Sequence, residues 1–329
     1  MTSENTSPEI LPDGRTVQPI RLTGGGLTLR LSPFGARVLD LRMDGVDHPL
    51  VLGSDHLAPY LGEMIYHGAL VGRFANRIAD ARFTLDGQNH TTDRNEGGAT
   101  TLHGGSDGSA AQLWTVEAQS DSSATLSLRM PDGHMGFPGT LDVQVVHSLP
   151  GDGTLAIEIT ATTDAPTPCS FAHHGYFALD GGEDVTTQTL RIDADRFLPV
   201  DARMIPLPEA PAPVADTRFD FRTPRPIGDA GIDHNFCLNG SGMRGVLRLE
   251  AANGLSLEVE TDQPGLQVYD ARNQEPILGL DGRRYGPFAG LALETQAWPD
   301  APNRADFPDA ILRPGETYRH RVSYIFARG

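Results

Sequence analysis

Two segments of the chain combine residue types that suit acid–base chemistry. In residues 169–179 (CSFAHHGYFAL), His173 and His174 lie within an apolar and aromatic stretch. If this stretch is a strand, the two imidazoles point to opposite faces, so only one of them enters a given cleft. In residues 290–300, Glu294 follows an apolar run, where half-burial would raise its pKa toward that of a useful base. The alternatives are a structural histidine pair and a strand-end glutamate exposed to water.

Three further segments concentrate groups that bind hydroxyls. Residues 72–78 (GRFANRI) place arginine forks beside an amide, a combination that can hydrogen-bond several hydroxyl groups. Residues 102–105 (LHGG) place two glycines beside an imidazole, which permits close backbone approach. In residues 231–236 (GIDHNF), Asp233 can accept hydrogen bonds from vicinal hydroxyls. Taken singly, the three also fit a surface arginine pair, a loop histidine and an Asx-turn before a strand.

The elements that must position these residues are short strands. Residues 27–31 (LTLRL) alternate strictly between leucine and polar residues, so one face is apolar. Turn residues such as Asp86-Gly87 and Asn253-Gly254 separate paired runs and predict hairpins. Residues 204–213 contain four prolines and are expected to be loop. The expected strands are residues 27–31, 38–43, 82–85, 113–118, 124–130, 141–149, 154–163, 246–251, 255–261 and 318–326.

Many hairpins without helical crossovers predict an all-β fold, a large and mostly antiparallel β-sandwich. Residues 1–18 are mostly polar and are expected to form a flexible tail. Residues 19–329 contain no linker, so we expect a single domain. The N-terminus lacks the features of a signal peptide, and no apolar run approaches the ~20 residues that span a membrane. We therefore expect a cytoplasmic protein without membrane partners.

Composition excludes several classes of function. The net charge of −17 disfavours binding to nucleic acid or to anionic membrane surfaces. All 26 basic residues are arginine, so Schiff-base chemistry and the P-loop, both of which need lysine, are excluded. The two cysteines, Cys169 and Cys237, have neither a metal-ligand spacing nor a disulfide framework.

Read together and in order, the segments resemble the aldose 1-epimerase (galactose mutarotase) family. The resemblance extends over residues 20–328 and implies a galactose-mutarotase-like β-sandwich, a free monosaccharide substrate such as glucose or galactose, and no metal or organic cofactor. We expect a monomer or homodimer. The matching stretches are residues 72–78, 83–87, 102–105, 133–139, 174–179, 233–234, 261–269 and 293–296.

The resemblance also implies roles for individual residues. His174 would be the general acid and Glu294 the general base of a reaction that opens a hemiacetal ring and recloses it on the other face. Tyr176 would lie close by. The sugar site would be lined by Asn76, Arg77, His103, Asp233 and Gln267. The family usually has asparagine before the catalytic histidine and serine after it, where this chain has His173 and Gly175.

Three alternatives remain open from the sequence. A catalytically silent sugar-binding module would keep the hydroxyl-binding residues and lose one of the acid–base pair. An epimerase for phosphorylated hexoses would need cations for the phosphate, such as Arg283 and Arg284. A metal-dependent enzyme would use His103, His173 and Asp233, although no recognised zinc signature is present.

Overall fold

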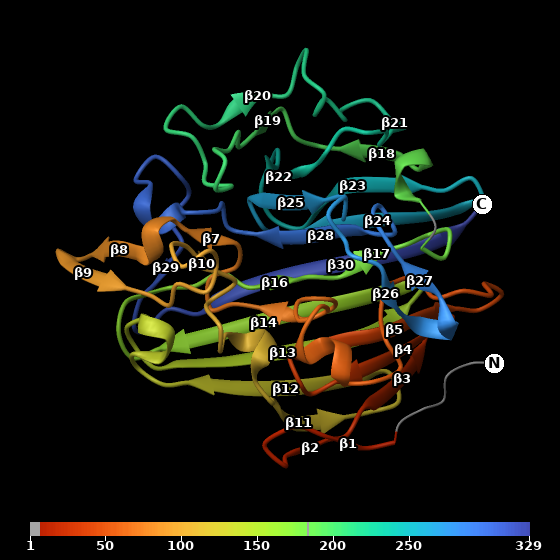
Figure 1. Ribbon diagram of the computed structural model, residues 1–329, viewed down its shortest axis with the longest axis horizontal. Helices are drawn as coiled ribbons and strands as arrows, with labels where there is room; N and C mark the ends of the chain where they lie inside the picture. The colour runs from red at the N-terminus through yellow and green to blue at the C-terminus, as the bar shows by residue number, and fades with distance from the viewer. Residues whose placement is uncertain (1–6, 183) are drawn as a thin grey trace.

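The computed structural model describes residues 7–182 and 184–329, and two antiparallel sheets dominate it (Figure 1). The larger sheet has nine strands and the smaller has six. In order across the larger sheet they are β11 (Thr115–Gln119), β12 (Ser123–Met130), β13 (Leu141–Gly151), β14 (Thr154–Thr163), β30 (Tyr318–Arg328), β24 (Leu255–Thr261), β23 (Arg244–Glu250), β18 (Thr189–Ile192) and β21 (Arg225–Pro226). In the smaller sheet they are β17 (Tyr176–Phe177), β28 (Leu291–Gln296), β25 (Gly265–Tyr269), β22 (Asp233–Cys237), β19 (Arg196–Phe197) and β20 (Ala212–Pro213).

Smaller pairings extend the two sheets. A three-stranded sheet contains β3 (Ile20–Gly24), β4 (Leu27–Ser32) and β5 (Arg37–Met43). The two-stranded pairs are β1 (Glu9–Ile10) with β2 (Thr16–Val17), β6 (Leu70–Val71) with β16 (Ala172–His173), β7 (Arg77–Ile78) with β10 (Thr101–Leu102), β8 (Arg82–Leu85) with β9 (Gln88–Thr91), β15 (Thr167–Pro168) with β29 (Ile311–Leu312), and β26 (Ile277–Leu278) with β27 (Arg284–Tyr285). The helices of the described residues are short 3₁₀ turns, and none of them is long and apolar enough to cross a membrane.

The predicted β-sandwich is confirmed, and so are the strands expected from alternation. Residues 27–31 and 38–43 lie in β4 and β5, and the runs flanking Asn253-Gly254 form the hairpin of β23 and β24. The strand expected over residues 113–118 begins two residues later, at Thr115. Along β13, buried and more exposed residues alternate for most of its length, as a strand with one covered face requires.

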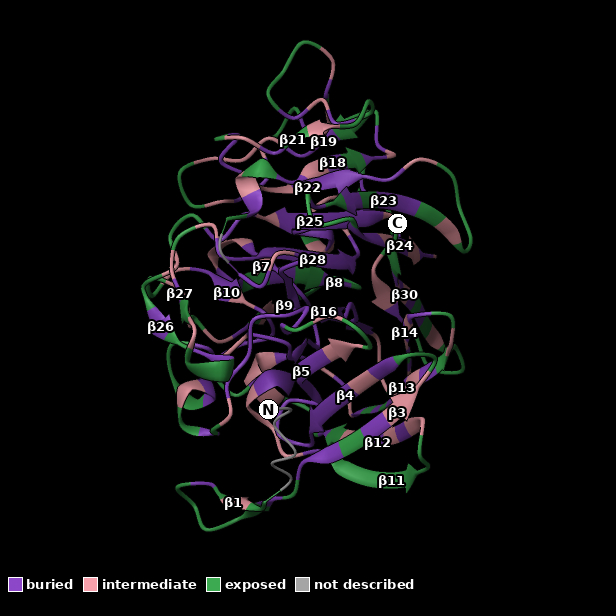
Figure 2. Ribbon diagram, turned by 90° about the vertical axis from the view of Figure 1, so that its right-hand side faces the viewer, coloured by how far each residue is buried: buried purple, intermediate pink, exposed green. Residues whose placement is uncertain are grey.

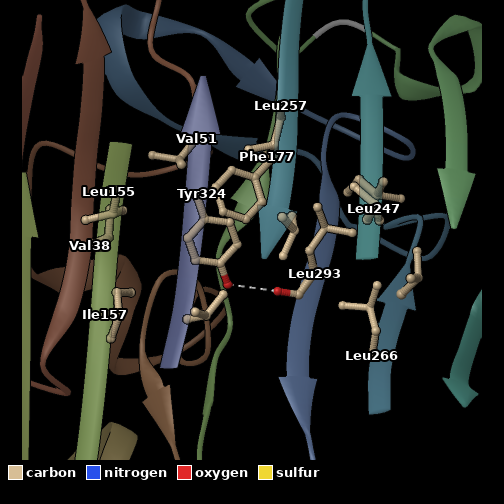
Figure 3. Packing of buried hydrophobic residues seen from close by; sticks show 14 of the residues in the cluster. Val38, Val51, Leu155, Ile157, Phe177, Leu247, Leu257, Leu266, Leu293 and Tyr324 are labelled. Carbon is tan, nitrogen blue, oxygen red and sulfur yellow. Dashed lines mark hydrogen bonds between the residues drawn. The ribbon is translucent and has the colours of Figure 1, made fainter. Parts of the chain in front are cut away.

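The main core lies between the two sheets. Leu155, Leu257 and Tyr324 from the larger sheet belong to the same buried cluster as Leu266 and Leu293 from the smaller one (Figure 3). Each large apolar side chain buried in this way contributes about 1.5–3 kcal/mol of transfer free energy. All six residues of β28 are buried, so this strand of the smaller sheet is covered on both faces (Figure 2). The face turned away from the core therefore has space for a second, polar set of side chains beneath covering segments.

The N-terminal segment differs from the tail that we expected over residues 1–18, of which residues 1–6 lie outside the described residues. Within the rest, β1 pairs with β2, and Leu11 and Val17 are buried. Both pack in a small cluster with Phe34 and Leu57. Two apolar side chains among many polar residues suffice to hold this hairpin against the body of the protein.

Candidate active site

The outer face of the smaller sheet presents a row of polar side chains. Because side chains alternate between faces, Gln267 and Glu294 point away from the core that contains Leu266 and Leu293. Gln267 and Glu294 lie directly opposite each other in the register of β25 and β28. The amide Nε2 of Gln267 donates to Oδ1 of Asp233, on the next strand, at 2.6 Å.

His174 reaches this row from the turn between β16 and β17. Its backbone N–H donates to the carbonyl of Ala69, and its own carbonyl accepts from Gly68, both at 2.8 Å. Its Nε2 lies 3.5 Å from Oε1 of Glu294. The two side chains are 6% and 3% exposed, so the fold brings together an imidazole and a carboxyl group from distant parts of the chain and removes both from bulk water.

Asn76 and His103 approach from the covering segments that contain β7 and β10. Both have a left-handed backbone, with φ of 61° and 52°. The backbone N–H of Asn76 donates to Nδ1 of His103 at 3.2 Å. Burial holds the pKa of His103 well below its usual value, so the ring is neutral and must have its proton on Nε2. His103 thereby presents an N–H donor, and its ring lies edge-on to His174 with 5.1 Å between centroids.

Arg77 lies beside Asn76 and is oriented by Glu96, a residue that the sequence analysis did not identify. The guanidinium Nε and Nη2 donate to the two carboxylate oxygens at 2.8 and 2.6 Å. The charge of Arg77 also acts on Asp233 and Glu294, where it lowers the pKa of each carboxyl group against the effect of burial. The bidentate pair fixes the fork of Arg77 at the edge of the polar row.

Two aromatic neighbours were also missed. The ring of Tyr66 stacks on His174 at 5.9 Å and lies 4.7 Å from His103. The ring of His67 stacks on Tyr176 at 4.1 Å. The one sequence signal for them was a Tyr-His-Gly run a few residues before the hydroxyl-binding segment at residues 72–78.

The protonation of the pair follows from its burial. Burial lowers the pKa of His174 to about 4. Burial raises the pKa of Glu294 to about 8; the charge of Asp233 adds to the rise, and Arg77 opposes it. At neutral pH the two groups therefore hold one proton between them. Among the described residues, Nδ1 of His174 and Oε2 of Glu294 are buried without a hydrogen-bond partner, so each group has an unused hydrogen-bonding position.

The geometry provides a weak match to a metal centre. Ligand atoms of His103, His174 and Glu294 lie within 4.8 Å of one another. Tetrahedral zinc, with bonds of ~2.0–2.1 Å, needs ligand atoms only about 3.4 Å apart, so these side chains are not preset for it. The ligand set considered from the sequence does not assemble, because His173 points into the core and contacts Tyr324.

The structure thus gathers the eight residues singled out from the sequence. Tyr176 completes the group, with its ring 5.1 Å from that of His174. The others are Asn76, Arg77, His103, His174, Asp233, Gln267 and Glu294. The arrangement is an acid–base pair surrounded by donors and acceptors for hydroxyl groups.

Comparison with known proteins identifies the family of the chain. The family model described as aldose 1-epimerase matches residues 18–325. Galactose mutarotase of Bos taurus is 39% identical over 95% of this chain and 94% of its own, and aldose 1-epimerase of Escherichia coli (strain K12) is 35% identical over 98% and 99%.

Solved structures show the same fold. A GalM/aldose epimerase homologue from C. elegans superposes with a TM-score of 0.89 at 30% identity, covering 95% of this chain and 99% of that one. Galactose 1-epimerase from Lactobacillus acidophilus NCFM gives a TM-score of 0.86 at 27% identity, covering 98% of each chain. The chain therefore belongs to the aldose 1-epimerase family.

Proposed function

We propose that the protein is an aldose 1-epimerase, which interconverts the α and β anomers of free aldoses such as glucose or galactose. The observation that supports this most directly is the buried pair of His174 Nε2 and Glu294 Oε1, 3.5 Å apart on a face lined by hydroxyl-binding groups. Relatives that extend over nearly the whole chain are named for this activity.

Glu294 is the base and His174 the acid of the proposed reaction. Glu294 takes the proton of the anomeric hydroxyl as C1–O1 becomes a carbonyl, the bond from C1 to the ring oxygen breaks, and His174 gives that oxygen a proton. Rotation about C1–C2 then precedes reclosure with the roles reversed. At neutral pH the pKa values place the single proton of the pair on Glu294, so the proposed reaction requires that it first move to His174, across the 3.5 Å between Oε1 and Nε2. Each group typically contributes ~10²–10⁴-fold.

The open-chain sugar must stay bound while its C1–C2 bond rotates. Asp233 and Gln267, already joined by a 2.6 Å hydrogen bond, provide an acceptor and an amide for vicinal hydroxyls. Arg77 and Asn76 provide further donors, with Arg77 held by Glu96. The Nε2–H of His103 is suited to stabilise negative charge near the ring oxygen. Tyr176 borders the site.

The same proposal extends to the setting of the protein. We propose a cytoplasmic monomer or homodimer in which residues 19–329 act as one domain, without nucleic-acid partners, metal or cofactor. The phosphorylated-hexose alternative is less well supported, because Nη1 of Arg283 donates to the carbonyl of Gly181, away from the acid–base pair. The silent-module alternative requires loss of one catalytic group, and both are present.

Polarimetry tests the proposal. The protein should accelerate the decay of rotation of freshly dissolved α-D-glucose or α-D-galactose to the same final value, before and after dialysis against EDTA. Glu294→Gln and His174→Asn should each lose most of the rate while circular dichroism stays unchanged. An unchanged decay across these sugars and the common pentoses would refute the activity, and wild-type rates in either variant would refute the roles.

A further inference from the structure

A buried tyrosine lies directly behind the proposed catalytic pair. Tyr324, on β30 of the larger sheet, is 0% exposed, and its hydroxyl donates to the carbonyl of Leu293 at 3.1 Å (Figure 3). The same hydroxyl oxygen lies 3.3 Å from Nδ1 of His173. Leu293 precedes Glu294 in the chain, and His173 precedes His174. One hydroxyl group therefore contacts both segments that present the acid and the base.

The protons of this contact can be assigned. A tyrosine hydroxyl has one proton and a carbonyl can only accept, so the proton of Tyr324 goes to Leu293. His173 must then donate its Nδ1–H to the hydroxyl oxygen. Burial holds the pKa of His173 well below its usual value, so the ring is neutral and Nε2 has no proton. That nitrogen is buried without a hydrogen-bond partner among the described residues, so Tyr324 provides the polar contact that orients His173.

A break in the sheet leaves the buried carbonyl of Leu293 without a partner from β17. In an antiparallel pair, the N–H and C=O of one residue point to the same neighbouring strand. The N–H of Leu293 donates to Gly175 at 3.4 Å, so its carbonyl also points toward the side of β17. There the ladder with β28 begins only at Tyr176, and the hydrogen-bonded pairing of the preceding β16 is with β6. At this end of the β17–β28 ladder, the hydroxyl of Tyr324 donates the hydrogen bond that the carbonyl of Leu293 accepts.

The two departures from the family pattern meet at this point. A Cβ atom added at Gly175 would lie 2.4 Å from Cε1 of His173, which is closer than real Cβ contacts come. The backbone of Gly175 does not have a positive φ, so the imidazole, and not the conformation, requires glycine here. The imidazole at position 173 therefore accounts for the glycine at position 175.

We propose that Tyr324 is a positioning residue for the epimerase site, whose hydroxyl holds the segments of His174 and Glu294 at their working separation through His173 and Leu293. The residue types at positions 173 and 175 depend on each other, because the imidazole of His173 leaves no room for a Cβ atom at Gly175. The inference rests on the proposed function for the roles of His174 and Glu294.

Tyr324→Phe tests whether the hydroxyl group of Tyr324 positions the catalytic pair, and Tyr285→Phe is the matched control. Tyr285 is equally buried, and its hydroxyl accepts from the N–H of Leu280, away from the pair. Tyr324→Phe should lower kcat by about tenfold to a hundredfold with KM little changed, because displacement of reacting groups by about 1 Å costs up to that much. Tyr285→Phe should keep the wild-type kcat. His173→Asn should lower kcat by less than Tyr324→Phe does, because it removes the contact to the hydroxyl and leaves the contact of that hydroxyl with Leu293.

Gly175→Ser tests the interdependence. It should lower kcat in the wild-type background and be tolerated together with His173→Asn, because the shorter asparagine removes the clash. Rates are compared per folded molecule, well below each melting temperature, so that lost stability alone does not change them. Equal losses from Gly175→Ser in both backgrounds would overturn the coupling.

NMR provides a readout that is independent of activity. In the wild type, the imidazole nitrogen shifts should show His173 protonated on Nδ1, and Tyr324→Phe should move the amide resonances of His174 and Glu294 where Tyr285→Phe does not. Protonation on Nε2, or unchanged amides with an unchanged kcat, would overturn the inference. A wild type without epimerase activity would refute the proposed function, and the NMR comparison would still decide the positioning role.

Discussion

Glu294→Gln should produce a protein that is inactive and more stable than the wild type, by a margin that grows with pH. Burial raises the pKa of Glu294 from the usual 4.5 to about 8. Between these two values the folded protein holds a proton that the unfolded chain has released. The free energy of unfolding therefore falls as the pH rises across this window. The stabilisation that the bound proton provides is complete only below pH 4.5. Glutamine keeps the shape of the side chain and does not ionise.

The size of the effect follows from the two pKa values. A shift of 8 − 4.5 = 3.5 is equivalent to a maximum of about 5 kcal/mol at 1.36 kcal/mol for each pKa unit. Integration over pH gives a wild-type penalty of about 1 kcal/mol at pH 5, about 3 kcal/mol at pH 7 and about 5 kcal/mol at pH 9. Glu294→Gln does not have this penalty, so its free energy of unfolding should exceed that of the wild type by these amounts.

Urea unfolding at these three pH values, with linear extrapolation to water, measures the margin. Glu209→Gln is the control, because Glu209 is exposed and water solvates its carboxylate in both states. Polarimetry on the same samples measures the rate, which should fall by ~10²–10⁴-fold in Glu294→Gln. A stability margin that does not change with pH would refute the burial argument, and a retained rate would refute the role of Glu294 as base.

Three further predictions concern other buried groups. Acid should unfold the protein: burial lowers the pKa of several histidines to about 3 or 4, so below the usual 6.5 the unfolded chain takes up protons that the folded one does not. Each can cost up to about 1.4 kcal/mol per pH unit, and a melting temperature that stays level from pH 7.5 to 5 would contradict this. His147→Leu should stabilise by about 1–3 kcal/mol in urea, because neither ring nitrogen of His147 has a partner among the described residues; a loss of stability would argue against it. Glu96→Gln should raise KM more than it lowers kcat in polarimetry, because Arg77 loses its charged partner; an unchanged KM would show that the fork needs no such support. The histidines whose low pKa values favour unfolding in acid are His67, His147, His234 and His320.

Most of the fold could be predicted from local patterns. Alternation in residues 27–31 and the Asn-Gly turn at residues 253–254 are properties of neighbouring residues, and strand geometry converts them directly into β4 and the β23–β24 hairpin. The N-terminal hairpin was not predicted, because its packing depends on Phe34 and Leu57, which are distant in the chain. Glu96 and Tyr66 were missed for the same reason: each acts through a partner that only the folded chain brings near.

The sequence by itself determined the chemical inventory, namely an all-arginine cationic set, a paired histidine, a glutamate after an apolar run and the family to which they point. It also predicted that His173 and His174 would face opposite ways if their segment were a strand. The family resemblance named His174 as the acid, but only the tertiary structure shows that His174 meets Glu294 while His173 contacts Tyr324 on β30. The unusual pKa values belong to the same category, because desolvation and the nearness of Asp233 and Arg77 exist only after the chain has folded around the pair.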